Sequence, residues 1–493
     1  MADIKFMLNS ADYRDRVYAA WIGKNIGGTM GGPFEGTHGM PEIDGFVTKP
    51  GRPLPNDDLD LQLVWLHAME TLGPAGVNSQ TLGEMWLSYI TAMWNEYGVA
   101  EVNMQNGLMP SMSGDYQNNW ADSNGAWIRT EIWATLMPGC PHLATKYAIE
   151  DAKVDHGCGE GTTAAAFVAF MQSAAFVIHD LRKCIELGLS AIPATSRTAK
   201  SVKMAIECYD NGMPLADARN KIQASNADMA DGWFEAPSNI AYAVLGMLYG
   251  EGDFKKSLIY AIHCGDDTDC TAATVGATLG ILGGTKAIPE ELKAYIGDDI
   301  INIAINKTSI GARFPKTCTA LTDRVTALAP HILFYLGAPV EISDREEVIS
   351  ADAEKIIADS CKATAASCAV KKYSSMYTSP IFNAEVELAD GPEITPSANK
   401  SIKVIFSNNI HVYDAKNYAL SFRWWLPDGF SVEGPRGMIL RNTVFARTNV
   451  SERTAEFMLT AKEELAAANR CVLEVTAAGR PTPLYIPITF LGR

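Results

Sequence analysis

The chain has 493 residues, of which 47% are hydrophobic, so its length and composition predict more than one domain with well-filled cores. Its 41 basic and 57 acidic residues give a formal net charge of −16 without any block rich in Lys and Arg, which excludes generic affinity for nucleic acid or anionic membranes. The first residues lack a secretion signal, the most apolar stretch (272–284) is too short and too often broken by Gly to span a bilayer, and the Cys residues include no close CxxC pair. We therefore expect a cytoplasmic protein that binds neither nucleic acid nor membranes.

Apolar residues recur near the helical period throughout residues 1 to about 340, where alternating strand patterns are nearly absent. The segments with this pattern are 12–26, 60–71, 81–94, 162–178, 181–189, 196–210, 214–223, 236–249 and 254–263. The pattern predicts an all-α domain over residues 1–340, with its chemistry carried by the loops between the helices.

The character of the sequence changes after Pro339. Residues 341–375 are first charged and then rich in Ala, Ser, Cys and Lys, which is typical of a partly helical connector. Short alternating runs follow at 384–388, 402–407, 419–426, 455–461 and 471–476, separated by Pro, Gly and Asn. This alternation predicts an antiparallel β-sandwich of the immunoglobulin-like type over residues 376–493.

One strand of the predicted sandwich places Trp425 on its outer face together with Ser421 and Arg423, opposite the apolar residues of the same strand. For an outward Trp, contact with another domain is favoured over sugar binding or contact with a partner subunit. A homo-oligomer formed through the β domain is the alternative that stays open.

An acidic cluster, Asn56-Asp57-Asp58-Leu59-Asp60, precedes one of the apolar-periodic segments. Asn as N-cap and acidic residues in the first turn are typical of an ordinary helix start. Capping accounts well for one or two acidic residues and poorly for three. A structural and a functional interpretation of this cluster alone therefore have similar weight.

A second cluster, Gly265-Asp266-Asp267-Thr268-Asp269-Cys270, precedes residues 272–280, whose small side chains suit close packing against a neighbouring helix. Such packing would hold the acidic helix end rigidly, as a metal site requires. The six Asp side chains of the two clusters cannot converge without a compensating cation. The two clusters together therefore predict a shared site for hard divalent metal ions.

Further motifs accompany these clusters in a fixed order. Along the chain they are the Gly-rich run from Gly23 to Glu35, Asn56-Asp57-Asp58, Asn124-Gly125-Ala126-Trp127-Ile128-Arg129, Asp155-His156, Gly232-Trp233-Phe234 and Gly265 to Ala273. In content and order, roughly the first 335 residues resemble the ADP-ribosylglycohydrolase family, which includes the dinitrogenase reductase-activating glycohydrolases. The last motif is the most specific, because it is similar to the family's Gly-Gly-Asp-Thr-Asp-Thr-x-Ala-Ala.

The resemblance implies the family's helical fold and a site for two Mg²⁺ or Mn²⁺ ions. The ligands it implies are Asn56, Asp57, Asp58, Asp267, Asp269 and Cys270. A thiol is a poor match for Mg²⁺, so water or Asp266 is expected to replace Cys270. Asp60 and Asp266 are additional to the family's motifs, and Gly28 stands where an Asp is common. These departures indicate a divergent subfamily and leave the substrate more open than the fold.

Two such ions can hold adjacent sugar hydroxyls and activate water, while a carboxylate handles the proton. Glu35 is the first candidate for this carboxylate because it ends a Gly-rich loop expected to be flexible, although a solvated loop Glu is the plain alternative. Asp122 is the reserve candidate, and Asp269 is expected to serve both metal binding and catalysis.

The expected substrate contacts are Asn124, Gly125, His156, Gly157, Gly159, Trp233 and Phe234. A lone His is more often a structural hydrogen-bonding group, and an aromatic pair before a helix is often part of a core. The leading hypothesis is a metal-dependent hydrolase that cleaves the glycosidic bond of an ADP-ribosyl group, so an ADP-ribosylated molecule or a small molecule is the expected partner. The alternatives are hydrolysis of another glycoside or nucleoside-like molecule, and a non-catalytic relative of the same fold.

Overall fold

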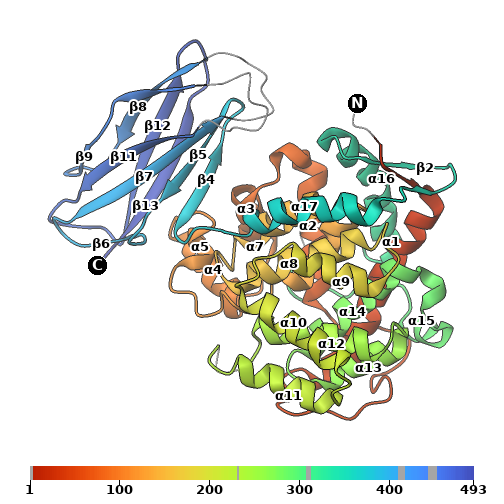
Figure 1. Ribbon diagram of the computed structural model, residues 1–493. Helices are drawn as coiled ribbons and strands as arrows, with labels where there is room; N and C mark the ends of the chain where they lie inside the picture. Colours follow the sequence, from red (N-terminus) through yellow and green to blue (C-terminus); the bar gives the residue numbers. More distant parts are fainter. Residues whose placement is uncertain (1–3, 230–232, 307–312, 409–416, 442–451) are drawn as a thin grey trace. The chain divides into compact units, whose positions relative to one another are not determined.

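The computed structural model describes residues 4–229, 233–306, 313–408, 417–441 and 452–493, and Figure 1 shows the course of the chain. The chain forms two compact units. The first consists of Met1–Tyr97 and Asn119–Ala369, and the second of Gly98–Asn118 and Val370–Arg493. The first unit is helical and the second contains two sheets. The predicted fold class, a helical N-terminal domain followed by antiparallel strands, is confirmed.

Helices make up nearly all regular structure of the first unit. In chain order the helices of both units are α1 (Ser10–Gly31), α2 (Asp57–Gly76), α3 (Ser79–Tyr89), α4 (Asn95–Gln105), α5 (Met112–Asp115), α6 (Glu131–Leu136), α7 (Pro141–Ala152), α8 (Glu160–Ala174), α9 (Leu181–Ser190), α10 (Arg197–Asp210), α11 (Leu215–Ser225), α12 (Ala236–Tyr249), α13 (Phe254–His263), α14 (Thr268–Gly283), α15 (Glu290–Ile296), α16 (Cys318–Leu336) and α17 (Ala353–Ser367). Of these, α5 and most of α4 belong to the second unit. Side chains cap many of the starts; for example, Asp253 accepts a hydrogen bond of 2.8 Å from the Lys256 N–H at the start of α13.

Helices α1 and α14 pack with their backbones in close contact. A Cβ atom added to Gly23 would lie 2.3 Å from the carbonyl oxygen of Gly276, and one added to Gly27 would lie 2.2 Å from that of Ala272. Only Gly permits this approach, which holds the start of α14 against the end of α1. The small residues of 272–280 therefore have the packing role predicted for them.

The same contact corrects one expectation about the Gly-rich run. Gly23 to Gly31 form the second half of α1, and only a short 3₁₀ turn (Gly32–Phe34) separates this helix from Glu35. The flexible Gly-rich loop expected before Glu35 is therefore wrong. Gly weakens an isolated helix, but burial against α14 compensates for that preference.

A small sheet with the order β2-β1-β3 joins the two ends of the helical unit. Strand β1 (Phe6–Asn9) pairs in parallel with β2 (Val340–Ser343) and antiparallel with β3 (Val348–Ile349). These strands are too short to show an alternating pattern in the sequence. Helix α17 follows them, inside the segment predicted as a partly helical connector.

The second unit is a sandwich of two five-stranded sheets. Its strands are β4 (Ser374–Thr378), β5 (Phe382–Glu387), β6 (Glu393–Ile394), β7 (Asn399–Asn408), β8 (Tyr418–Trp425), β9 (Ser431–Glu433), β10 (Gly437–Leu440), β11 (Glu452–Thr460), β12 (Ala468–Ala477) and β13 (Leu484–Gly492). The sheet orders are β10-β8-β12-β13-β6 and β4-β5-β7-β11-β9, and all pairs except β13 with β6 are antiparallel. Alternate residues of both sheets form one apolar core.

Strand β8 shows the alternation predicted for it. Tyr418 and Leu420 are buried, whereas Trp425 is 48% exposed. The Trp425 indole N–H donates a hydrogen bond of 2.7 Å to Glu474, and the Arg423 guanidinium lies 4.0 Å from the centre of the Trp425 ring. The outer face of this sheet is therefore polar as well as aromatic.

One segment of the sandwich unit comes from the middle of the predicted all-α domain. Leu108 and Met112 join the apolar core of the sandwich. Asp115 accepts a hydrogen bond of 2.7 Å from the Tyr373 N–H, next to β4. The compact units therefore differ from the predicted division at 1–340, 341–375 and 376–493, because Gly98–Asn118 packs with strands far away in the sequence.

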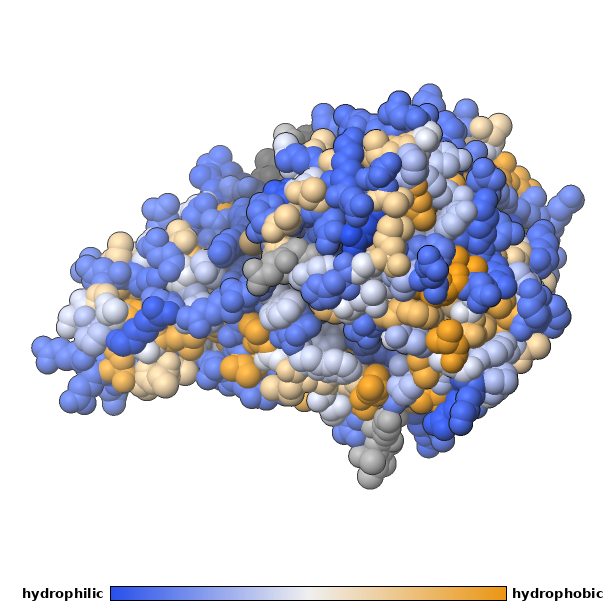
Figure 2. Space-filling view, turned by 90° about the horizontal axis from the view of Figure 1, so that it is seen from below, coloured by the Kyte–Doolittle hydropathy of each residue, from blue (hydrophilic) through white to orange (hydrophobic). Residues whose placement is uncertain are grey.

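Figure 2 shows hydrophilic residues interspersed with smaller groups of hydrophobic ones over the face that it presents. Among the helices in the described ranges, none is both long and apolar enough to cross a membrane.

Candidate functional site

Two helix starts bring the acidic clusters together. Asp57 and Asp58 open α2, while Asp267 is the N-cap of α14 and Asp269 lies in its first turn. Ligand atoms of Asp58, Asp269 and Cys270 lie within 4.8 Å of one another, and so do those of Glu35, Asp267 and Asp269. Asp269 therefore belongs to both groups and stands at the centre of the site.

The carboxylates are crowded and largely buried. Asp58 is 0% and Asp267 is 4% exposed, and burial raises the pKa of both carboxyls well above the usual range, with a further increase from the charge of Asp269. Burial, followed by the charge of Asp269, raises the pKa of Asp57 to about 6. A cluster of buried carboxylates of this kind favours the binding of protons or cations, and its many oxygen atoms suit Mg²⁺ or Mn²⁺.

Several of these oxygens have no hydrogen-bond partner among the described residues. They are Oδ1 of Asp267, Oδ1 of Asp269 and also Oδ2 of Asp58, which faces the Lys24 ammonium at 3.7 Å. A buried carboxylate oxygen without a partner costs free energy. The residues present therefore fit a site that is completed by divalent cations.

Neighbouring polar groups orient the carboxylates. The Asn124 amide donates a hydrogen bond of 2.6 Å to Oδ2 of Asp267 and accepts one of 2.9 Å from the Trp127 indole. Tyr97 donates a longer bond of 3.3 Å to Asp57. Asn124 was expected to contact substrate, but its amide is directed at Asp267, so it positions a candidate ligand.

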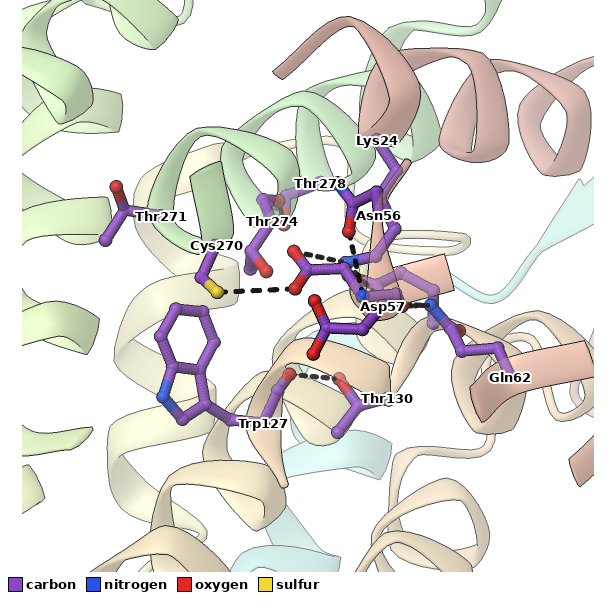
Figure 3. A network of polar contacts seen from close by, with 12 residues as sticks. Lys24, Asn56, Asp57, Gln62, Trp127, Thr130, Cys270, Thr271, Thr274 and Thr278 are labelled. Carbon is purple, nitrogen blue, oxygen red and sulfur yellow. Dashed lines mark hydrogen bonds and ion pairs between the residues drawn. The ribbon is translucent and has the colours of Figure 1, made fainter. Parts of the chain in front are cut away.

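A buried cation that the sequence motifs do not predict lies next to the site. The Lys24 ammonium is 3.7 Å from Oδ2 of Asp58 and 3.2 Å from Oε2 of Glu131, and all three side chains are fully buried. Burial disfavours the charged form, but Glu131 and Asp58 outweigh that effect and raise the pKa of Lys24. Gln62 and Gln172 donate hydrogen bonds of 2.9 and 3.0 Å to Glu131. Lys24 and Gln62 are among the side chains labelled in Figure 3.

Cys270 faces the carboxylates at the start of α2. Its Sγ lies 3.3 Å from Oδ1 of Asp58, and Figure 3 shows this contact as a dashed line. Asn56 also lies at the site, where its Oδ1 accepts a hydrogen bond of 2.8 Å from the Asp58 N–H. A Cβ atom on Gly28 would be 1.9 Å from the Asn56 amide nitrogen, so the absence of a side chain at position 28 leaves the space that Asn56 occupies.

Two acidic residues of the clusters point elsewhere. Oδ2 of Asp60 accepts hydrogen bonds of 2.5 and 2.7 Å from the backbone N–H groups of Ile303 and Ala304. Oδ2 of Asp266 accepts one of 2.8 Å from the Asn239 amide. The convergence therefore involves four Asp residues and not six, and Asp266 does not take the place of Cys270.

Asp266 instead ties Glu35 to the aromatic segment. Its backbone exchanges hydrogen bonds with Gly36 and Thr37, and its carboxylate accepts one of 3.1 Å from the Phe234 N–H. It does so with a left-handed backbone, at φ 63°. The Trp233 ring lies against the His38 ring, with centroids 3.4 Å apart. Glu35 and the pair Trp233–Phe234 are therefore held beside the same site, whereas Gly232 lies outside the described residues.

Glu35 is the exposed acid of the site. Its carboxylate lies in one group with Asp267 and Asp269. The charge of Asp269, followed by burial and the charge of Asp57, raises the pKa of Glu35 to about 7. An accessible carboxyl that titrates near neutral pH can both accept and donate a proton.

The other residues predicted to act in catalysis or substrate binding lie around this site and make structural contacts. Asp122 accepts a hydrogen bond of 2.7 Å from the Glu160 N–H at the start of α8. His156 is fully buried between Asp155 at 2.9 Å and Ser123 at 3.2 Å, which is the structural alternative considered for it. Gly125, Gly157 and Gly159 permit close packing or tight turns: a Cβ atom on Gly125 would meet Glu96 at 2.0 Å, one on Gly159 would meet the Ala121 carbonyl at 2.1 Å, and Gly157 has φ 53°.

Similarity to known proteins extends over most of the helical unit. The sequence model of the family described as ADP-ribosylglycohydrolase matches residues 9–320. A solved structure described as an ADP-ribosylglycohydrolase-related protein complex is 18% identical, and the match covers 66% of this chain and 99% of that chain with a TM-score of 0.42. The GAE domain of GGA2p from Saccharomyces cerevisiae is 14% identical over 24% of this chain and 94% of that chain, with a TM-score of 0.15. No curated protein shows significant similarity to the chain. The family match includes the segments that supply Glu35, Asp58 and Asp269.

Proposed function

The chain belongs to the ADP-ribosylglycohydrolase family, and from this premise we propose that it is a metal-dependent hydrolase that cleaves the glycosidic bond of an ADP-ribosyl group. Family membership supports a glycohydrolase-type activity in general. The convergence of carboxylates from the starts of α2 and α14, with Glu35 beside them, carries the more specific proposal.

Asp57, Asp58, Asp267 and Asp269 would hold two Mg²⁺ or Mn²⁺ ions. When bound, such ions orient vicinal hydroxyl groups and activate water. Asn124 and Tyr97 keep the carboxylates of Asp267 and Asp57 in place through the hydrogen bonds described above. The site is thereby preorganised before a substrate arrives.

Glu35 would move the proton. As a carboxylate it accepts a proton from the attacking water, and as a carboxylic acid it donates one to the leaving atom. A pKa near neutrality suits both directions, and exposure lets Glu35 reach a substrate. Trp233 and Phe234 would form the wall beside it.

The test is a panel of ADP-ribosylated peptides together with simple aryl glycosides, each incubated with Mg²⁺, Mn²⁺ or EDTA. We expect metal-dependent release of ADP-ribose, and its loss in Asp269→Asn. Metal-dependent turnover of the aryl glycosides alone would favour the second candidate, hydrolysis of another sugar. Gly28 and Cys270, which depart from the family's motifs at the site, favour that candidate. Metal binding without turnover of any substrate would indicate a non-catalytic relative.

A further inference from the structure

The two groups of ligand atoms that share Asp269 differ in their chemistry. Glu35, Asp267 and Asp269 offer only carboxylate oxygens, whereas Asp58, Asp269 and Cys270 add a sulfur atom. In each group the ligand atoms lie within 4.8 Å of one another, which is close enough to surround one ion. The site therefore contains an oxygen-only half and a sulfur-containing half.

The Cys270 thiol lies in polar surroundings, which is unusual for a buried Cys. Buried thiols commonly pack as small hydrophobic groups. The Cys270 sulfur instead contacts Oδ1 of Asp58 at 3.3 Å and points toward the carboxylates, as Figure 3 shows. Its side chain is 6% exposed, so solvent reaches the sulfur poorly.

Two buried carboxylate oxygens of the site make no hydrogen bond within the described part of the chain. Oδ2 of Asp58 and Oδ1 of Asp267 make no hydrogen bond to any residue that the structure describes, although both side chains are more than nine-tenths buried. The Lys24 ammonium lies on the Oδ2 side of Asp58, at 3.7 Å. Oδ2 of Asp58 therefore faces Lys24, whereas Oδ1 faces the Cys270 sulfur, so two of the candidate ligand atoms of this half lie side by side.

We propose that the two ion positions differ, and that the one bounded by Asp58, Asp269 and Cys270 selects a transition-metal ion over Mg²⁺. Sulfur ligands favour Mn²⁺, Fe²⁺, Co²⁺ or Zn²⁺, in increasing measure toward the softer ions, whereas Mg²⁺ requires oxygen. Cys270 would hold such an ion as a thiolate, with its S–H proton released to solvent. This inference rests on the metal site of the proposed function but not on its substrate.

The test is a titration of the full-length protein with Co²⁺ alone, followed by near-ultraviolet absorption. A sulfur ligand produces a thiolate-to-Co²⁺ charge-transfer band, which oxygen ligands lack. We expect the band in the wild type and in Cys158→Ser, the matched control at an exposed Cys outside the site. We expect no band in Cys270→Ser.

Calorimetric competition between Mn²⁺ and Mg²⁺ gives the second readout. Cys270→Ser should lower the preference for Mn²⁺ by about tenfold or more, while it keeps or tightens Mg²⁺ binding because a hydroxyl oxygen replaces the sulfur. An unchanged thermal midpoint in EDTA would show that the variant folds. A wild type without the band, or an unchanged metal preference in Cys270→Ser, would overturn the inference. Failure to find a glycosidic substrate would affect the proposed function alone, because neither readout involves turnover.

Discussion

The interiors of the two units are built from different kinds of side chain. In the helical unit, Lys24, Asp58 and Glu131 are fully buried around the candidate site. In the sandwich, the core is a continuous apolar cluster that includes Val404 and Leu473. Apolar burial stabilises by roughly 25 cal/mol per Å², whereas a buried charge costs free energy unless it is paired. The charged groups of the helical core are therefore favourable only while they stay paired, a condition that does not apply to the apolar cluster of the sandwich.

Among the variants, Asp269→Asn should have the largest effect, because it changes the charged interior of the helical unit. It removes the carboxylate shared by both ligand groups, so metal affinity should fall strongly and turnover by about a thousandfold or more. The metal-free protein should become more stable, because the charge of Asp269 repels Glu35, Asp58 and Asp267. Calorimetry and thermal unfolding in EDTA measure both effects.

A substitution in the sandwich core supplies the matched control for Asp269→Asn. Leu473→Ala should lower stability by about 2–5 kcal/mol and leave metal affinity unchanged. Equal loss of metal binding in both variants would show that metal affinity does not depend specifically on the charged interior of the helical unit.

Lys24→Met tests whether the buried charges of the helical unit depend on each other. Removing the ammonium leaves Glu131 and Asp58 without their cation, which should cost about 3–5 kcal/mol of unfolding free energy. The double variant Lys24→Met/Glu131→Gln should recover much of this loss. Urea unfolding measures the unfolding free energy of both variants. If Lys24→Met were as stable as the wild type, the proposed dependence of Glu131 and Asp58 on Lys24 would be wrong.

Glu35→Gln should separate proton transfer from metal binding. Turnover should fall by roughly a hundredfold, as for a lost general base, with metal affinity nearly unchanged. Steady-state kinetics on the substrate identified by the panel provides the measurement. Asp122→Asn is the control, since Asp122 binds the start of α8. Full turnover in Glu35→Gln with none in Asp122→Asn would reassign the role to Asp122.

The smallest expected effect is a pH dependence of stability without metal. The pKa values of Asp57 and Glu35 are raised to about 6 and about 7, while such groups titrate near pH 4 in an unfolded chain. Between about pH 4 and pH 7 the folded protein holds protons that the unfolded chain has lost, so stability should fall as pH rises. The thermal midpoint in EDTA should drop by about a few degrees over this range. Mg²⁺ or Mn²⁺ should raise it more at pH 7.5 than at pH 5, and a midpoint that rises with pH in EDTA would contradict the assignment.

Apolar periodicity alone was sufficient to predict the helices and strands in which the pattern is long. Residues 254–263 were predicted as a helix and form α13 with the same bounds, and 419–426 nearly coincides with β8. Periodicity failed where packing overrides local preference, as at Gly27 to Gly31, which extend the helix predicted over 12–26 because α14 lies against them. Gly98–Asn118 gave no signal either, because its partners are strands about 270 residues later in the chain.

The acidic motifs located the site but not the direction of each side chain. Asp58 and Asp60 look alike at a helix start, yet Asp60 turns away because the Ile303 and Ala304 N–H groups lie beside it. Asp266 binds the Phe234 N–H for a similar reason. Lys24 could have been suspected, since a Lys among Gly and Ile on a packed helix must be buried with a partner. Its partner Glu131 lies in a different motif, so only the folded chain reveals the pair.

The 1.9 Å approach between a Cβ atom on Gly28 and the Asn56 amide constrains how this site can evolve. An Asp introduced at position 28 would collide with Asn56, and a smaller residue at position 56 would leave an empty space beside Gly28. Each change is therefore unfavourable alone and acceptable with the other, so positions 28 and 56 are epistatic. A side chain at position 28 is therefore expected to arise together with, or after, a change that shortens Asn56.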